Sequence, residues 1–157
     1  MKMVLNYTKN KEVLVFENEN KIQDIRARMV DMFFEGEVIM KVSKNMEILE
    51  ISGNLNSRLS KKCPQALDTL NKIKGRRIGG GITKIVHGVV GKKCPYLASL
   101  VMECVEGAIL GMTAAPLEKV VPQLQKSPKD FTKKNLIKFM PNMKNSCIAY
   151  TLPEETK

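Results

Sequence analysis

The chain has 157 residues, of which 43% are hydrophobic and 27% are charged; this ordinary globular composition excludes disorder along its whole length. Aromatic residues make up only 5% and tryptophan is absent, so a binding surface built on aromatic side chains is not expected. The formal net charge of +10 allows an acidic partner but does not specify one.

The chain shows no export signal, since its first residues contain no apolar run of secretory length. The longest apolar stretch, Tyr96–Ala115, carries Glu103 and Glu106 in its middle, where carboxylates would cost several kcal/mol in hydrocarbon. We interpret this stretch as a buried helix, and we expect a cytoplasmic protein without membrane association. Four cysteines in such a chain indicate reduced thiols, metal ligands or core residues rather than disulfides.

Residues 12–54 have the pattern of β-strands. Four short runs are rich in β-branched and apolar residues: Glu12–Glu17, Ile25–Phe34, Glu37–Ser43 and Glu47–Ser52. The pairs Glu35-Gly36 and Lys44-Asn45 are good turn formers between these runs, which predicts an antiparallel meander.

From residue 64 the apolar residues recur with a helical period. Three stripes lie at 66–73, 78–90 and 97–109, with Gly75 after the first, and with 79–81 and Gly91 bounding the second. Strands followed by helices predict an α+β fold, in which a small antiparallel sheet of three or four strands carries helices on one face.

Residues 1–115 are predicted to form this core domain, and residues 116–157 a proline-rich, basic C-terminal extension packed on it. Five prolines fall within the extension, so we expect only short helical pieces there, around Leu117–Val121 and Phe131–Phe139.

A repeated tetrapeptide is the most specific local signal. Lys61-Lys62-Cys63-Pro64 and Lys92-Lys93-Cys94-Pro95 each stand immediately before an amphipathic helix. Proline is favoured at the first helical position, which places each cysteine at an N-cap. The helix dipole and the neighbouring lysines should lower the pKa of such thiols, so both are candidates for reactive or metal-binding thiolates. The alternative is that Cys-Pro merely begins a helix and that Lys-Lys is common in a basic chain.

The remaining candidates are less specific. Cys104 lies on the apolar stripe of its helix, about 15 Å from Cys94 at 1.5 Å per residue, and is predicted to be a core residue. Cys147 lies in the extension and is a candidate fourth ligand if that segment folds back. His87, between apolar positions, is interpreted as structural rather than as a ligand.

The stretch Asp31 to Ile109 resembles the iron–sulphur cluster assembly scaffolds of the IscU/NifU N-terminal type. In that family an aspartate precedes the sheet edge, a cysteine begins the helix after the last strand, and a His-Cys pair begins the long final helix. Asp31, Cys63 and Cys94 stand at the matching places, but Met29 replaces the family's first cysteine and Lys93 its histidine.

The chain also resembles an uncharacterised domain-of-unknown-function family with a Gly-Cys-Thr-His-Leu motif. The stretches Lys74–Gly81 and Lys93–Leu97 would be this chain's versions of its motifs, with Tyr96 in place of the histidine.

These resemblances imply a scaffold-like protein, more a binding protein than an enzyme, that holds a metal ion, an iron–sulphur cluster or a sulphur species. Its metal ligands would be Cys63, Cys94, Asp31 and Cys147, its cargo an iron–sulphur cluster or a zinc or iron ion, and its partner a sulphur donor or recipient protein.

Two alternatives stay open: a thiol redox or sulphur-transfer protein, in which one thiolate attacks and the other resolves, and a non-catalytic structural or partner-binding domain. Nucleic acid is left open by the charge of +10 but is not favoured, because the lysines are scattered over several elements and lack interleaved aromatic residues.

Overall fold

The computed structural model describes residues 5–126, 137–138, 144–145, 148 and 151. The chain divides into two compact units, residues 1–113 and 114–157. The description below concerns the first unit, which contains the sheet, the helical layer and three of the four cysteines.

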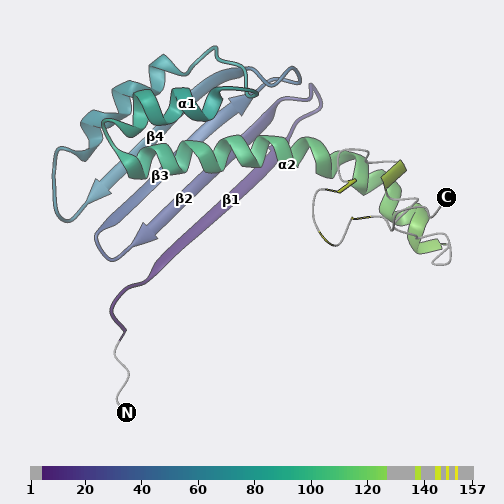
Figure 1. Cartoon of the computed structure of the whole chain (residues 1–157), viewed down its shortest axis with the longest axis horizontal. Coiled ribbons are helices and arrows are strands. Elements are labelled where there is room, and N and C mark those ends of the chain that lie inside the picture. The colour runs from purple at the N-terminus through teal and green to yellow at the C-terminus, as the bar shows by residue number, and fades with distance from the viewer. Residues whose placement is uncertain (1–4, 127–136, 139–143, 146–147, 149–150, 152–157) are drawn as a thin grey trace. The chain divides into compact units, whose positions relative to one another are not determined.

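Four strands form one antiparallel sheet in which each strand pairs with the next along the chain (Figure 1). They are β1 (Lys9–Glu17), β2 (Gln23–Asp31), β3 (Phe34–Val42) and β4 (Ile48–Ser57). The predicted meander and the α+β class are therefore confirmed.

The turn between β2 and β3 lies earlier than predicted. The expected strand Ile25–Phe34 ends at Asp31, and Glu35-Gly36, the expected turn, lies inside β3. The physical reason is the Asp31 carboxylate, whose Oδ1 accepts hydrogen bonds from the backbone N–H groups of Phe33 and Phe34, each at 2.8 Å. An aspartate that binds the backbone two and three residues ahead closes a turn by itself, so no glycine is needed.

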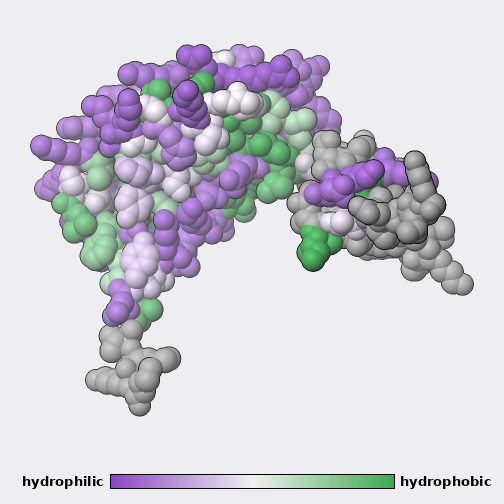
Figure 2. Space-filling model, viewed as in Figure 1, coloured by the Kyte–Doolittle hydropathy of each residue, from purple (hydrophilic) through white to green (hydrophobic). Residues whose placement is uncertain are grey.

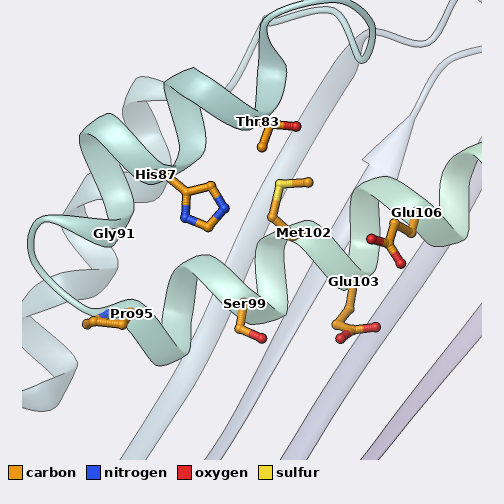
Figure 3. Close-up of a pocket in the computed structure, with 8 residues that line it drawn as sticks. All are labelled: Thr83, His87, Gly91, Pro95, Ser99, Met102, Glu103 and Glu106. Atoms are coloured by element: carbon orange, nitrogen blue, oxygen red, sulfur yellow. The ribbon is translucent and has the colours of Figure 1, made fainter.

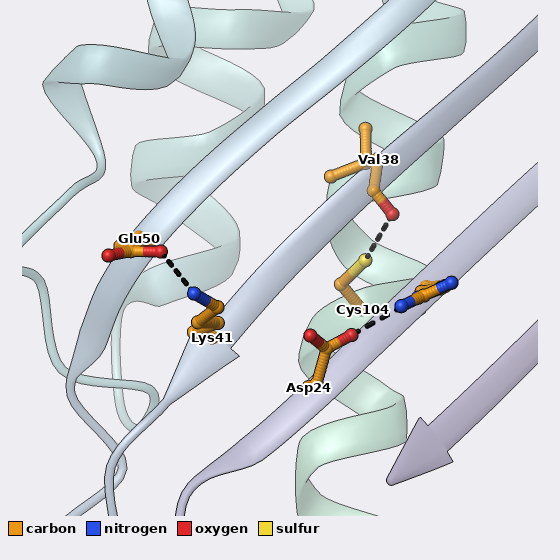
Figure 4. A network of polar contacts seen from close by, with 6 residues as sticks. Asp24, Val38, Lys41, Glu50 and Cys104 are labelled. Atoms are coloured by element: carbon orange, nitrogen blue, oxygen red, sulfur yellow. Dashed lines mark hydrogen bonds and ion pairs between the residues drawn. The ribbon is translucent and has the colours of Figure 1, made fainter.

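The two faces of the sheet differ in polarity. The inward-facing residues of β2 and β3 are almost fully buried and begin the core: Ile25, Ala27, Met29, Val38, Met40 and Val42. The other face carries ion pairs, which are Arg26–Asp24, Arg28–Glu35 and Lys41–Glu50 (Figure 4 shows part of this network). Because only one face is apolar, the helices cover only that face.

The helical layer follows the sheet in the chain and covers its apolar face (Figure 1). It consists of the 3₁₀-helix η1 (Cys63–Lys72), the short helix α1 (Ile82–Val86), the π-helical turn η2 (His87–Gly91) and the long helix α2 (Pro95–Lys126). All three predicted stripes contribute to the core, through residues such as Leu70, Ile73, Val86, Val90, Leu97 and Val101.

Helix α2 packs closely on the sheet at Gly107. A Cβ added there would lie 3.0 Å from Val13 Cγ1 and 3.2 Å from Ile25 Cγ2, so glycine permits the approach. By length and apolar composition alone, Pro95–Ala114 would suffice to cross a membrane, a test that the core helix of a soluble protein also passes. Leu97, Val101 and Cys104 on this helix are buried in the core, as the sequence predicted.

The prediction of only short helical pieces after residue 115 is wrong for the first of them. Helix α2 continues through Pro116 and Pro122 to Lys126. A proline removes one backbone hydrogen bond from a helix and strains it locally, but the helix can resume on either side. Of the second predicted piece, Phe131–Phe139, only residues 137–138 are described, and they are helical.

Candidate functional site

The two cysteines of the repeated tetrapeptide meet at one pocket. Cys63 begins η1 and Cys94 immediately precedes α2, and both line a pocket of about 350 Å³. Its other lining residues are Ser60, Lys62, Gln65, Ala66 and Lys93. The packing of η1 beside the start of α2 therefore brings together two thiols that are 31 positions apart in the sequence.

Cys94 is the N-cap of α2, as predicted. Its Sγ accepts a hydrogen bond from the backbone N–H of Leu97 at 3.4 Å, which satisfies one of the unpaired N–H groups of the first helical turn. Only 8% of Cys94 is exposed. This geometry places the sulphur at the positive end of a long helix.

Cys63 differs from Cys94, and the prediction that it is an N-cap is wrong by one residue. The N-cap of η1 is Lys62, whose φ of −87° and ψ of −13° are already helical, and no side chain caps this helix. Cys63 is therefore the first helical residue, and it is half-buried. The two identical tetrapeptides thus give two unequal thiols: the Cys94 thiol is buried and caps a helix, whereas the Cys63 thiol is more accessible.

The charges around the two thiols are positive. Lys62 and Lys93 line the pocket, and its lining contains no aspartate or glutamate. Ammonium groups in the lining of a pocket attract anionic ligands. The pocket therefore combines two thiols with two cations, as the sequence motif suggested.

Asp31 does not line this pocket. Besides closing the β2–β3 turn, its carboxylate accepts a hydrogen bond from the hydroxyl of Tyr7 through Oδ2, at 3.0 Å. The pKa of Asp31 is lowered, first by the hydrogen bond from the Phe33 N–H and further by those from Tyr7 and Phe34. The position that the resemblance assigned to a ligand therefore has a structural task in the hairpin, and neighbouring Met29 is a fully buried core residue.

The other two cysteines are Cys104, on helix α2, and Cys147, in the C-terminal extension. Cys104 is fully buried and its Sγ donates to the carbonyl oxygen of Val38 at 3.7 Å, so its prediction as a core residue is confirmed (Figure 4). Burial raises the pKa of the Cys104 thiol to about 12. Cys147 lies outside the described residues, so its role as a ligand stays a prediction.

A metal site completed by the described residues does not fit this arrangement. No group of three or more histidine, cysteine, aspartate or glutamate side chains is placed to hold a metal ion within the described ranges, 5–126 and the few residues beyond. Cys63 and Cys94 supply two donors, whereas a closed tetrahedral site needs four. The pair is therefore half of a thiolate site, and the remaining ligands would have to come from elsewhere.

A second pocket, of about 720 Å³, lies between the α1–η2 segment and α2 (Figure 3). His87 lines it from one side, while Met102, Glu103 and Glu106 line it from the other. His87 is exposed, and its interpretation as a structural residue rather than a ligand stays a prediction. The spacing of Thr83, His87 and Gly91, four residues apart, was the signal that these residues share one helical face.

Comparisons with known proteins identify no relative: no protein-family model, no curated protein and no solved structure matches this chain.

Proposed function

We propose that the protein is a thiolate scaffold that holds a thiophilic cargo, a metal ion or a metal–sulphide cluster, on Cys63 and Cys94 and passes it to a partner. The observation that carries the proposal is the single pocket lined by both cysteines. Two thiols that share one pocket can act on the same bound group, which neither could do if the helix starts lay apart.

The incomplete donor set supports a transient cargo rather than a resident metal. A structural metal site closes its coordination with protein ligands, whereas a site with open positions can exchange its ligands. Cys63 is half-buried and the flanking Lys62 and Lys93 are exposed, so a partner can reach the pocket from solvent. The missing ligands would then be supplied by a partner, by the cargo itself or by Cys147.

The two lysines favour a cargo that is anionic once it is bound. A bare divalent cation is repelled by ammonium groups, whereas a metal centre with several thiolate or sulphide ligands carries net negative charge. Lys62 and Lys93 would stabilise such a centre in the pocket. This electrostatic argument favours a metal–sulphide cluster over a lone zinc ion.

A second candidate is thiol–disulfide exchange, which the unequal exposure of the two thiols favours. The Cys63 thiolate would attack a partner disulfide, forming a mixed disulfide and releasing one partner thiolate. Cys94 would then attack Cys63 Sγ and release the second partner thiolate. The pair loses two electrons, the partner disulfide gains them, and the two protons pass to the partner thiolates.

The test is anaerobic isolation of the full chain, followed by measurement of its iron, zinc and acid-labile sulphide. We expect metal in the wild-type protein and loss of it in both Cys63→Ser and Cys94→Ser, with Cys104→Ser as the matched control that leaves it unchanged. Metal retained in both single variants would refute the proposal. A metal-free protein that forms an intramolecular Cys63–Cys94 disulfide when given an oxidised dithiol would support the second candidate instead.

A further inference from the structure

The net positive charge of the chain is concentrated in one segment. Residues 58–94 contain ten lysines and arginines and a single acidic residue, Asp68, so this segment carries nine of the ten net charges. The side chains of all ten basic residues are exposed: Arg58, Lys61, Lys62, Lys72, Lys74, Arg76, Arg77, Lys84, Lys92 and Lys93. We call these ten residues the basic layer.

The fold gathers the basic layer on one side of the first unit. Its residues come from the loop before η1, from η1 itself, from the loop to α1, from α1 and from the turn before α2, and these elements cover the same face of the sheet (Figure 1). Hydrophilic side chains crowd the rim of this unit beside α1 (Figure 2). These cations therefore share the helical side of the first unit, with Arg76 beside the first residue of β4 and Arg58 just after its last.

The cations of the basic layer are not neutralised by carboxylates. All five ion pairs among the described residues use cations of the sheet or its hairpins, which are Lys11, Lys21, Arg26, Arg28 and Lys41. Lys74 of the basic layer helps to lower the pKa of Glu50, although the hydrogen bond from Lys41 contributes most and Lys74 makes no direct ion pair with Glu50. The ten ammonium and guanidinium groups therefore remain free to meet an external polyanion.

The surface of this segment is almost free of apolar anchors. Leu59 is the one large hydrophobic residue that is exposed between residues 58 and 94. Protein interfaces draw most of their binding energy from buried aromatic and aliphatic anchors, whereas interfaces with nucleic acid are polar and strongly positive. The composition of the basic layer therefore fits a phosphate backbone better than it fits an acidic protein.

The loop with Arg76 and Arg77 is built to present charge from a fixed backbone. The Arg76 carbonyl accepts a hydrogen bond from Ile48 N at 2.9 Å, and Ile78 N donates to the Met46 carbonyl at 2.7 Å, which ties the loop to the start of β4. Both arginine side chains remain exposed, and a guanidinium can bind a phosphate through two parallel hydrogen bonds.

We propose that the basic layer binds the phosphodiester backbone of a nucleic-acid duplex without sequence preference. The absence of exposed aromatic residues between 58 and 94, which counted against nucleic acid in the sequence, argues only against stacking on single-stranded bases. Duplex binding needs phosphate contacts alone. This inference does not depend on the proposed function of the thiol pocket.

The test compares two variants of the full chain with the same loss of charge. In the first, Lys72, Arg76, Arg77 and Lys84 of the basic layer are changed to glutamine, all away from the lining of the thiol pocket. In the matched control, Lys21, Arg26, Arg28 and Lys41 are changed to glutamine instead; these side chains make exposed ion pairs, whose loss costs little stability.

Binding is measured by fluorescence anisotropy with a labelled DNA duplex and a matching RNA duplex over a series of salt concentrations. Each phosphate contact contributes about 0.9 to the slope of log K against log salt, so up to four lost contacts should lower this slope by as much as about 3.6. At about 0.1 M salt that corresponds to roughly a tenfold loss of affinity for each contact. The control variant should keep at least most of the wild-type affinity.

Equal weakening of both variants would overturn the proposal, because only net charge would then matter. So would a wild-type protein that binds neither duplex at low salt, whether or not it binds anionic vesicles or polyglutamate. Different affinities for the two duplexes would show whether the basic layer prefers DNA or RNA, and either preference supports the proposal.

Discussion

The unequal environments of the cysteines predict a large difference in their reaction with iodoacetamide at pH 8. The reactive species is the thiolate, so the rate depends on how much of each thiol is ionised and on access to the sulphur. Cys104 is fully buried, while Cys63 is half-buried at the thiol pocket.

The magnitude follows from the pKa of Cys104, which burial raises to about 12. At pH 8 a thiol with that pKa is ionised in about one molecule in ten thousand, whereas a thiol with an ordinary pKa of about 8.5 is ionised in roughly a quarter. Cys104 should therefore be alkylated at least about 1,000 times more slowly than an ordinary exposed thiol. Cys63 should react first, and Cys94, which is 8% exposed, should follow it.

The assay is quenched alkylation of the native protein followed by peptide mass spectrometry, with protein unfolded in urea as the control in which all four cysteines react alike. Native rates for Cys104 within about tenfold of Cys63 would refute the reasoning, because neither burial nor the thiol pocket would then govern reactivity.

Further predictions concern stability and the role of Asp31. Because hydrogen bonds from Phe33 and its neighbours lower the pKa of Asp31 in the folded state, its contribution to stability is present above about pH 4, the ordinary value, and is lost as the pH falls through the folded-state pKa. Thermal unfolding across this range should show that loss in the wild type and not in Asp31→Asn. Asp31→Ala should lower the melting temperature without changing metal retention at a temperature where it is folded, whereas loss of metal from the folded variant would restore Asp31 as a ligand. Gly107→Ala should destabilise the protein by about 1 kcal/mol, since overpacking costs about 1–3 kcal/mol and helix propensity returns up to about 1 kcal/mol. Gly88→Ala, with no atom within 4 Å of the added carbon, should be neutral or stabilising in the same urea titration, and a Gly107→Ala variant of equal stability would contradict the close approach of α2.

The strands and helices could be predicted because each buries one face, so that its apolar residues recur at the spacing typical of a strand or a helix. The β2–β3 turn could not be placed correctly, because the pair Glu35-Gly36 is the stronger local turn signal. What decides the turn is the Asp31 carboxylate, which binds two N–H groups ahead of it in the chain. From the sequence alone, an aspartate that closes a turn cannot be distinguished from an aspartate that binds a metal.

The thiol pair could be predicted because the tetrapeptide Lys-Lys-Cys-Pro occurs twice, each time before a helix. The difference between the two thiols could not, because the same four residues begin a 3₁₀-helix at Cys63 and a long α-helix after Cys94. Lys62 has already entered the helical conformation, which moves the cap away from Cys63. The tetrapeptide is the same in both places, so the backbone conformation of Lys62 makes the difference between the two caps.

The position of the basic layer on one side of the fold could not be predicted from the order of its residues along the chain. Its lysines and arginines occur in two helical elements, η1 and α1, and in the loops around them, without a run longer than two. Only the stacking of these elements on one face of the sheet places them on one side of the first unit. Asp24, Glu35 and Glu50 of the sheet form ion pairs with the sheet's own cations rather than with the layer.

The central claim is that Cys63 and Cys94 form one site, and cobalt titration of the reduced full chain tests it most directly. Thiolate ligands to Co²⁺ give an intense sulphur-to-metal charge-transfer absorption, so the band reports the number of coordinating thiols. We predict that the wild type and Cys104→Ser show the band, and that Cys63→Ser and Cys94→Ser each lose at least half of it and bind cobalt far more weakly. Either single variant with wild-type intensity and affinity would contradict the shared site, as would a wild-type protein that shows no band and also forms no Cys63–Cys94 disulfide with an oxidised dithiol.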